Sequence, residues 1–268
     1  MAPLRGVRFL ARYGPWALVA GASEGIGAAF ARALAARGLN LVLLARRVGP
    51  LATLAADLSA RHGVETRVMA LDLTSPGLNA AVEKETKDLE IGLVVCNAAL
   101  SLISDFLELE LSDVLRSVDT NVRAPLVLVH LFGRRMAERG RGGVVLMSSV
   151  AGIIGSPHSA TYAGCKAFAL GFGDSLWAEL EPRGVDVVTC VAGPTETPTY
   201  AQVRTSSFPP TMSPDEVALA ALATLGKRPR VVPGLFNRLT TWLLAPLPRT
   251  LTLRMIAAQT KKFATRRH

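Results

Sequence analysis

The stretch that most constrains the fold is an apolar run followed at once by a glycine-rich turn. Residues 16–20 read WALVA, and residues 21–27 read GASEGIG, which spaces the glycines as G-x-x-x-G-x-G. Residues 28–37 have helix-forming composition and end at Gly38. A strand, a glycine turn and a helix N-terminus bring free backbone amides and the helix dipole together, which favours binding of an anionic pyrophosphate. Outside this context a glycine-rich turn is usually only a turn.

The alternation of apolar runs and helix-forming segments continues along the chain. Six further strands are predicted at residues 39–45, 66–71, 91–96, 144–147 (ending at Ser148 or Ser149), 185–191 and 230–232. Helices are predicted at residues 50–62 and 76–88. Three more are predicted with caps: one capped by Ser112 that runs through His130 with a kink at Pro125, one capped by Ser159 or Thr161 that ends near Glu181, and one capped by Ser213. This order predicts an α/β fold with a mostly or wholly parallel seven-stranded sheet and ligands at the carboxyl ends of the strands.

The N-terminus and the cysteines bear on location. The opening segment MAPLRGVRFLARYGPWALVAGAS places basic residues before an apolar run, as a signal peptide does, but it leads straight into the glycine turn. We interpret this apolar run as the first strand and expect no membrane-spanning helix. Three cysteines, Cys96, Cys165 and Cys190, form neither an even set nor a C-x-x-C pair. This pattern favours a reducing compartment, so we expect a cytoplasmic protein, with peripheral contact at a membrane as the alternative.

The net charge of +9 belongs to the C-terminal part of the chain. Residues 217–268 contain ten Lys/Arg and no Asp or Glu. Pro246 and Pro248 divide the extension at 235–268 into two helical pieces with apolar runs. These features suit an anionic membrane surface or a lipophilic substrate, but they also suit a helix packed on the body or a subunit interface followed by a solvated basic end. The extension is too apolar to be a nucleic-acid-binding arm.

A candidate acid/base pair lies in residues 142–166. Tyr162 and Lys166 are four residues apart, which places them on one face of a helix. Lowering a phenol pKa from about 10 to about 7 requires roughly 4 kcal/mol of preferential phenolate stabilisation. A neighbouring Lys⁺ supplies part of this and a cationic cofactor ring the rest. Ser149, at a strand end, could meet the phenol and hold a substrate oxygen. Most Y-x-x-x-K pairs taken alone are solvated helix faces.

Residues at the other strand ends indicate cofactor contacts. Arg46 and Arg47 follow the second strand with no carboxylate beside them, which favours NADP(H) with a 2′-phosphate over NAD(H), although both arginines could simply begin a solvated loop. Asp72 ends the third strand, where a carboxylate could accept from an adenine amino group. Asn121 is a weak helix former that could hold a water or a backbone carbonyl near the site, or be an ordinary exposed or capping residue.

Taken in order and spacing, these motifs resemble the short-chain dehydrogenase/reductase (SDR) family over about residues 14–235. They are GASEGIG, Asn97-Ala98-Ala99, Asn121, Ser149, Tyr162-x-x-x-Lys166 and Gly193-Pro194-x-x-Thr197. Six linked motifs are far more specific than one. The resemblance implies a single Rossmann-like, three-layer domain over residues 1–268, with a substrate lid at about 196–212. Ala20, Cys96, Ala99 and Ala192 depart from the usual family pattern around the cofactor loops but remove no catalytic group.

By this resemblance the catalytic residues are Asn121, Ser149, Tyr162 and Lys166. Tyr162 is the general acid/base, Lys166 lowers its pKa and binds the nicotinamide ribose, Ser149 orients the substrate oxygen, and Asn121 holds a relay water. Ser149 is preferred to Ser148 for its thirteen-residue offset to Tyr162. The implied cofactor contacts are Gly21, Ser23, Glu24, Gly25, Ile26, Gly27, Arg46, Arg47, Asp72, Leu73, Asn97, Ala98, Tyr162, Lys166, Pro194, Thr195 and Thr197. We assign no metal ligands.

The resemblance implies an NADP(H)-dependent oxidoreductase that moves hydride between nicotinamide and a carbonyl or secondary alcohol, with a lipophilic ketone or 3-oxoacyl-type compound as the expected substrate. The alternative is a non-catalytic NADP(H)-binding regulator or membrane-associated scaffold, against which the intact Ser149, Tyr162 and Lys166 count. The family usually forms dimers or tetramers through its long central helices, here those beginning near Ser112 and Ser159. A homodimer or homotetramer is therefore expected, without a nucleic-acid partner.

Overall fold

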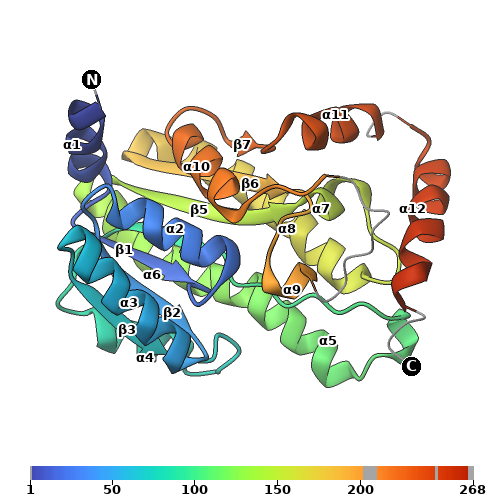
Figure 1. The fold of residues 1–268 in the computed structure, drawn as a ribbon, viewed down its shortest axis with the longest axis horizontal. Coiled ribbons are helices and arrows are strands. Elements are labelled where there is room, and N and C mark those ends of the chain that lie inside the picture. Colours follow the sequence, from blue (N-terminus) through green and yellow to red (C-terminus); the bar gives the residue numbers. More distant parts are fainter. Residues whose placement is uncertain (1, 202–209, 245–246, 265–268) are drawn as a thin grey trace.

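The computed structural model describes residues 2–201, 210–244 and 247–264, with side chains described from residue 7 to residue 257 of those ranges. Its centre is one sheet of seven strands, all parallel, in the order β3-β2-β1-β4-β5-β6-β7 (Figure 1). The strands are β1 Trp16–Ala20, β2 Asn40–Ala45, β3 Thr66–Ala70, β4 Ile91–Cys96, β5 Gly142–Ser149, β6 Val185–Ala192 and β7 Arg230–Val231. The predicted Rossmann-like α/β fold is confirmed, and the sheet is wholly parallel.

The four central strands are buried along almost their whole length, from β2 through β1 and β4 to β5. Their sequences are nearly continuous apolar runs because helices cover both faces of a parallel sheet, so no side of the strand meets water. The strand predictions agree with the structure to within two residues at each end. The apolar runs of the sequence therefore predict where each strand begins and ends.

Helices form a layer on each face of the sheet (Figure 1). On one face, α2 Gly25–Ala35, α3 Val48–His62 and α10 Pro214–Thr224 pack around Phe30, Leu51 and Val217. On the other face, α4 Leu78–Thr86, α6 Ala124–Arg139 and α8 Ala160–Leu180 pack around buried apolar residues that include Leu128 and Phe132. These two cores account for the three layers. The start of α10 carries the predicted cap, because Ser213 and Glu216 form a complete capping box.

The apolar run at residues 16–20 is the first strand, as predicted, and a helix that was not predicted precedes it. Residues Ala2–Tyr13 form helix α1, and the strand begins at Trp16. Arg12 and Tyr13 both donate to the Asp186 carboxylate of β6, at 3.0 Å from Arg12 Nε and 2.7 Å from Tyr13 Oη. These contacts attach α1 to the amino-terminal edge of the sheet, a long-range pairing that local hydrophobic periodicity does not reveal.

The long helix predicted from Ser112 divides in two. Helix α5 spans Leu111–Val118, a π-helical turn spans Asp119–Arg123, and α6 follows. Pro125 has no N–H, so the Asn121 carbonyl loses its ordinary α-helical donor, and the predicted irregularity takes the form of a π-turn. The predicted Ser112 cap was wrong, because Glu110 occupies that position. Ser159 does precede α8, but its hydroxyl donates to the Leu102 carbonyl at 3.0 Å instead of capping the helix.

The carboxyl ends of the strands meet at one edge of the sheet, where the remaining helices gather (Figure 1). Short helices α7 Val150–Ile154 and α9 Pro198–Ala201 follow β5 and β6 respectively, and 3₁₀ turns lie at Phe106–Glu108 and Glu181–Arg183. The C-terminal extension forms α11 Leu235–Leu244 and α12 Arg249–Ala264, as the two predicted pieces. Residues 202–209, within the predicted lid, lie outside the described residues.

Two glycines of α8 provide a matched test of the packing against the sheet. A Cβ at Gly173 would lie 1.9 Å from Thr189 Oγ1 of β6, whereas a Cβ at Gly171 meets nothing within 4 Å. Gly173→Ala should lower the free energy of unfolding by about 2–3 kcal/mol through overpacking. Gly171→Ala should raise it by up to about 1 kcal/mol through helix propensity. Urea unfolding of the two variants checks this, and equal effects would contradict the packing of α8 on β6.

Candidate active site

Two adjacent serines at the end of β5, Ser148 and Ser149, have different hydrogen-bond partners. Ser148 is 3% exposed, and its hydroxyl donates to the Lys166 carbonyl at 2.7 Å. Ser149 ends the strand and caps α7, where its Oγ accepts from the Ala151 N–H at 3.3 Å. Successive side chains of a strand point to opposite sides. Ser148 therefore ties α8 to the sheet, and Ser149 is the hydroxyl at the open edge.

Tyr162 and Lys166 lie one helical turn apart on α8, as their spacing predicts. The Lys166 ammonium is 5.4 Å from the centre of the Tyr162 ring. Lys166 is 3% exposed, and its Nζ donates to the Met147 carbonyl of β5 at 3.0 Å. Ser149 lies close enough to the Tyr162 hydroxyl to act on its pKa. Phenol, ammonium and serine hydroxyl thus converge at the carboxyl edge of the sheet.

Burial sets the protonation states of this group. Removal from water raises the pKa of Tyr162, and the nearby Ser149 hydroxyl acts in the opposite direction. Removal from water also lowers the pKa of Lys166 to about 8 from its ordinary 10.5, although the nearby Cys165 and Cys96 oppose this change. At neutral pH the pair therefore consists of a phenol beside an ammonium. That is the state in which the phenol can give up a proton and the ammonium can stabilise the phenolate.

The depressed pKa of Lys166 predicts a pH-dependent stability. Between pH 8 and 10.5 the unfolded chain keeps the proton on this lysine and the folded chain releases it. Lys166 therefore contributes a rise in the free energy of unfolding with pH across this window, on the order of 3 kcal/mol for this residue alone. Lys166→Met should remove this rise, with Lys227→Met at an exposed lysine as the matched control. Urea unfolding at a series of pH values measures it, and parallel curves for wild type and Lys166→Met would disprove the lowered pKa.

Asn121 lies in the π-turn with its amide group buried. Its Nδ2 donates to the Leu100 carbonyl at 2.8 Å and to the Ser117 carbonyl at 2.9 Å. Its Oδ1 is buried and has no hydrogen-bond partner among the described residues. An unpartnered buried oxygen is uncommon and usually marks a function or a bound water. The placement of Asn121 next to the Tyr162 and Lys166 helix agrees with the role that the resemblance implies.

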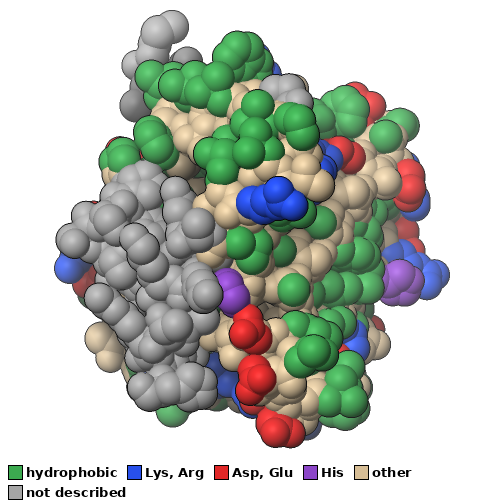
Figure 2. All heavy atoms as spheres, turned by 90° about the vertical axis from the view of Figure 1, so that its right-hand side faces the viewer, with side chains coloured by type: hydrophobic (Ala, Val, Ile, Leu, Met, Phe, Trp, Pro, Cys, Tyr) green, Lys and Arg blue, Asp and Glu red, His purple; other side chains and the backbone are tan. Residues whose placement is uncertain are grey.

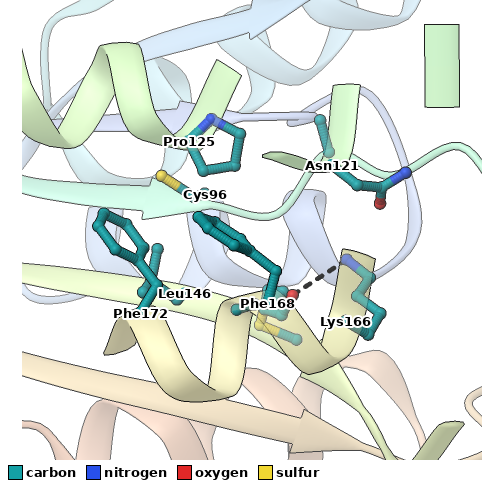
Figure 3. A pocket seen from close by; sticks show the side chains of 10 residues that line it. Cys96, Asn121, Pro125, Leu146, Lys166, Phe168 and Phe172 are labelled. Atoms are coloured by element: carbon teal, nitrogen blue, oxygen red, sulfur yellow. Dashed lines mark hydrogen bonds between the residues drawn. The ribbon is translucent and has the colours of Figure 1, made fainter. Parts of the chain in front are cut away.

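A small cavity connects Asn121 with Lys166 (Figure 3). The space open to the centre of a water molecule there is about 10 Å³, and the lining residues include Met147 and Phe168. Figure 3 shows Lys166 reaching toward the Met147 carbonyl, with Asn121 above it and Phe168 and Phe172 closing the other end. A volume of about 10–15 Å³ on this measure holds a single water. The cavity therefore has room for about one water between Asn121 and Lys166.

The glycine turn between β1 and α2 has the backbone that a phosphate-binding turn needs. Gly21 and Gly25 have positive φ angles of 82° and 56°, which glycine adopts without strain. A Cβ at Gly27 would lie 1.9 Å from the Gly21 carbonyl oxygen, so only glycine fits where the helix crosses the turn. Asn97 Nδ2 donates to the same carbonyl at 3.1 Å. Ser23, Glu24 and Ile26 lie in this turn or in the first turn of α2, where helix amides are free.

The two arginines after β2 differ in their surroundings. Arg47 pairs with Glu24 of the glycine turn, which neutralises its charge locally. No carboxylate forms an ion pair with Arg46 among the described residues. Asp72, after β3, has a pKa below its usual range because it accepts from the Thr74 N–H at 2.9 Å and lies near Arg46. Arg46 therefore keeps its charge free of an ion pair within the described part of the chain, and Leu73, next to Asp72 in the sequence, is buried.

The loop after β6 faces the glycine turn. The methyl group of Thr197 lies 3.0 Å from where a Cβ of Gly25 would be. Thr195 is buried, and its hydroxyl donates to the Gly193 carbonyl at 2.9 Å. Thr195 also forms a β-bridge with Met212, and the Met212 N–H donates to the Pro194 carbonyl at 3.0 Å. Ala98, after β4, lies against Gly21 on the same side. The glycine turn, the end of β4 and the loop after β6 therefore lie together at the carboxyl edge.

Sequence reasoning missed two connections at this edge. His158 Nδ1 lies 2.6 Å from Asp105 Oδ1, and His158 has a positive φ of 62° that is uncommon outside glycine. This pair joins the loop before α8 to the loop after β4. The pair of Glu24 with Arg47 was also missed. Opposite charges in two neighbouring strand-end loops were the available signal for the second pair, whereas no local signal links residues 53 positions apart.

Comparison with known proteins gives one consistent result. The family model described as short chain dehydrogenase matches residues 15–207. A 7beta-hydroxysteroid dehydrogenase of Collinsella aerofaciens is 32% identical over 237 residues, which cover 85% of this chain and 89% of that protein. A very-long-chain 3-oxoacyl-CoA reductase of Phaeosphaeria nodorum is 34% identical, over 81% of this chain and 66% of that protein.

Solved structures agree with the sequence relatives. A structure of a 7beta-hydroxysteroid dehydrogenase superposes with a TM-score of 0.87 at 30% identity, covering 93% of this chain and 99% of that one. A short-chain dehydrogenase from Sphingobium yanoikuyae in complex with NADPH gives a TM-score of 0.76 at 30% identity, over 88% and 97% of the two chains. With the family match, the wholly parallel sheet and the site at its carboxyl edge, the chain belongs to the short-chain dehydrogenase/reductase family, oxidoreductases that act on CH–OH groups with NAD(P).

Proposed function

We propose that this protein is an NADP(H)-dependent oxidoreductase that interconverts a lipophilic ketone and its secondary alcohol. The observation that carries the proposal is the convergence of Tyr162, Lys166 and Ser149 at the carboxyl edge of the sheet, next to the glycine turn. The ammonium lies 5.4 Å from the centre of the phenol ring, and Ser149 lies close enough to the phenol to act on its pKa. A non-catalytic nucleotide-binding protein has no use for three such groups held together.

The site at the carboxyl edge of the sheet has the features expected for binding a phosphorylated dinucleotide. Its floor is a glycine turn in which a side chain at position 27 would collide with the backbone, so backbone amides are open to close approach by a pyrophosphate. Arg46 and Asp72 end adjacent strands at one side, and Thr195 and Thr197 line the other. When bound, the dinucleotide supplies the hydride for reduction or accepts it in oxidation. Arg46 would hold the 2′-phosphate, and Lys166 would donate to the nicotinamide ribose.

The residues of the site would handle the proton. In the reducing direction Tyr162 Oη donates a proton to the carbonyl oxygen while Ser149 Oγ donates a hydrogen bond to the same oxygen. The phenolate that results is stabilised by the ammonium of Lys166. The water held by Asn121 and Lys166 would return a proton to Tyr162 from solvent. In oxidation Tyr162 would start as phenolate and remove the hydroxyl proton.

The substrate class follows from two sources. The relatives named above act, by their names, on hydroxysteroids and on very-long-chain 3-oxoacyl-CoA, both of which carry a large apolar body beside the reacting oxygen. In this chain the active-site edge is bordered by α7 with Ile153 and Ile154, and by Leu253 of α12, which contacts the position of Gly155. Steady-state oxidation of NADPH with carbonyl steroids, 3-oxoacyl esters and simple aldehydes tests the proposal. Turnover confined to small polar aldehydes would refute the lipophilic class.

Cofactor preference gives a charge-reversal prediction. Arg46→Asp should raise the NADPH dissociation constant by about 10- to 100-fold, since it deletes a charge-assisted contact and adds repulsion of the phosphate. The NADH dissociation constant should change by less than about threefold. Arg47→Asp is the matched control and should weaken NADPH binding less, because Glu24 already occupies Arg47. Fluorescence titration gives both constants, and equal losses for NADPH and NADH would discard the 2′-phosphate role.

Subunit assembly is expected through α5, α6 and α8. These helices expose large apolar side chains that a second copy could cover, namely Leu111, Leu115, Val118, Leu126 and Phe168. We propose that a homodimer or homotetramer forms on this surface. Light scattering with Leu115→Glu would measure the assembly, and an unchanged mass for this variant would exclude the interface.

A further inference from the structure

Helix α11 presents its apolar side outward. On a helical wheel of 100° per residue, Leu235, Leu239, Trp242 and Leu243 share one arc, with Phe236 at its edge. All five are exposed, Leu235 to 74% and Trp242 to 72%. The opposite arc carries Asn237, Thr240, Thr241 and Leu244, which are buried or partly buried. An ordinary surface helix has the reverse arrangement, with its apolar stripe toward the core.

The inward side of α11 is fixed by close packing, so the helix cannot simply roll over. Asn237 is 4% exposed, and its Nδ2 donates to the Pro233 carbonyl at 2.9 Å. A Cβ at Gly193 would lie 2.2 Å from Asn237 Oδ1, which shows how tightly the amide fits against the loop after β6. Thr241 donates to the Asn237 carbonyl. The polar inner face of α11 therefore packs against the loop after β6, and this packing keeps the apolar face turned toward the outside.

Helix α12 also exposes large apolar side chains over the part whose side chains are described. Thr252 is 1% exposed, while Leu251 and Met255 are about half exposed. Arg249 donates to the Ile153 carbonyl of α7 at 2.9 Å, which places α12 beside the active-site edge. Figure 2 views this side of the molecule and shows hydrophobic side chains gathered across its upper part, with Lys or Arg side chains among them. We call the exposed residues 235, 236, 239, 242, 243, 251 and 255 the outer apolar face.

The charge around the outer apolar face is of one sign. Arg238 and Arg254 are exposed on the same two helices, and no carboxylate forms an ion pair with either within the described part of the chain. The sequence from residue 217 to its end contains no Asp or Glu, and it adds Lys261, Lys262, Arg266 and Arg267 beyond α12's described side chains. A second copy of this face would meet it with like charges. An anionic surface would meet it with opposite ones.

We propose that the outer apolar face binds the surface of an anionic lipid bilayer. Trp242 would lie at headgroup depth, where the indole ring is most favourable, and the leucines would reach the acyl boundary. The arginines would contact anionic headgroups, so binding weakens as salt screens these charges. Within the described parts of the chain, no helix combines the length and apolar character needed to cross a bilayer. The contact proposed is therefore peripheral, and it does not depend on the proposed reaction.

Vesicle flotation tests this with the full-length chain. The protein should float with phosphatidylcholine/phosphatidylglycerol vesicles at low salt, and binding should fall at high salt and on vesicles of phosphatidylcholine alone. Leu239→Gln combined with Trp242→Gln should lower binding by at least about tenfold, because two apolar contacts are lost. Val48→Gln combined with Leu219→Gln, at exposed apolar residues of α3 and α10, is the matched control and should bind as wild type does.

A second measurement locates the contact on the protein and separates a loss of binding from a loss of folding. Brominated lipids in the anionic vesicles should quench wild-type tryptophan fluorescence, and Trp242→Phe should lose that quenching while Trp16 and Trp177 remain. Thermal unfolding and NADPH titration show that the variants are folded. Absence of wild-type binding to anionic vesicles would overturn the proposal. So would a Leu239→Gln/Trp242→Gln variant whose sedimentation mass falls while its vesicle binding is retained, since that result makes the face a subunit interface.

Discussion

Tyr162→Phe is expected to reduce kcat for NADPH-dependent ketone reduction by about 100- to 10,000-fold, the range that a positioned general acid provides. Phenylalanine keeps the ring that packs beneath the Lys166 ammonium, 5.4 Å away, and deletes only the hydroxyl. The NADPH dissociation constant should therefore change by less than about tenfold, since at most one hydrogen bond is lost. Stopped-flow measurement of a single turnover separates the two effects.

Tyr13→Phe is the matched control for this variant. Tyr13 is also buried and also loses a hydroxyl, but its partner is Asp186 at the opposite edge of the sheet, 2.7 Å away. It should lower stability by about 1 kcal/mol and leave kcat unchanged. If Tyr162→Phe turned over as fast as Tyr13→Phe, Tyr162 would not be the proton donor.

Gly27→Ala is expected to weaken NADPH binding by about 10- to 100-fold, the equivalent of about 1–3 kcal/mol of overpacking. The new methyl group would lie 1.9 Å from the Gly21 carbonyl oxygen and 2.7 Å from Asn97 Nδ2. Neither neighbour can yield without moving the turn, because one is backbone and the other holds that same carbonyl. The helix would be displaced from the turn, and its free amides would no longer converge on the pyrophosphate.

Gly49→Ala provides the control, because it is also a glycine-to-alanine change at the start of a helix but lies outside the glycine turn. A Cβ at Gly49 meets nothing within 4 Å, so this variant should bind NADPH as wild type does. Isothermal titration of both variants gives the dissociation constants. Wild-type affinity in Gly27→Ala would show that the turn can relax, and that the close crossing of helix and turn is not required for binding.

The strands of the sheet and the positions of the site residues along the chain were predictable because both depend on local sequence patterns. Continuous apolar runs mark strands buried on both faces, and each of the predicted site residues follows such a run or lies on the helix after one. The choice between Ser148 and Ser149 was not decidable from the apolar pattern. In the structure the first hydroxyl is committed to the Lys166 carbonyl, and the second caps α7 at the open edge. The assignment of chemical roles to these residues remains a prediction.

Features that depend on contacts distant in sequence were not predictable. Helix α1 was not predicted, because its attachment relies on Arg12 and Tyr13 meeting Asp186, more than 170 positions away. The Ser159 hydroxyl donates to the Leu102 carbonyl instead of capping the helix, a tertiary contact that overrides the capping preference. Likewise, the sequence alone does not show which side of the C-terminal helices faces the body; in the structure Asn237 and Thr252 are inner residues of α11 and α12.

The most direct test of the enzyme assignment follows a hydride into product. Wild-type protein would be mixed with NADPH carrying deuterium at the transferable C4 position and with a carbonyl steroid or 3-oxoacyl ester, and the product alcohol examined by mass spectrometry. The account predicts one deuterium on the carbinol carbon, formed by wild type and nearly absent with Tyr162→Phe. Tight NADPH binding with no deuterated alcohol from any carbonyl offered would contradict the reductase assignment.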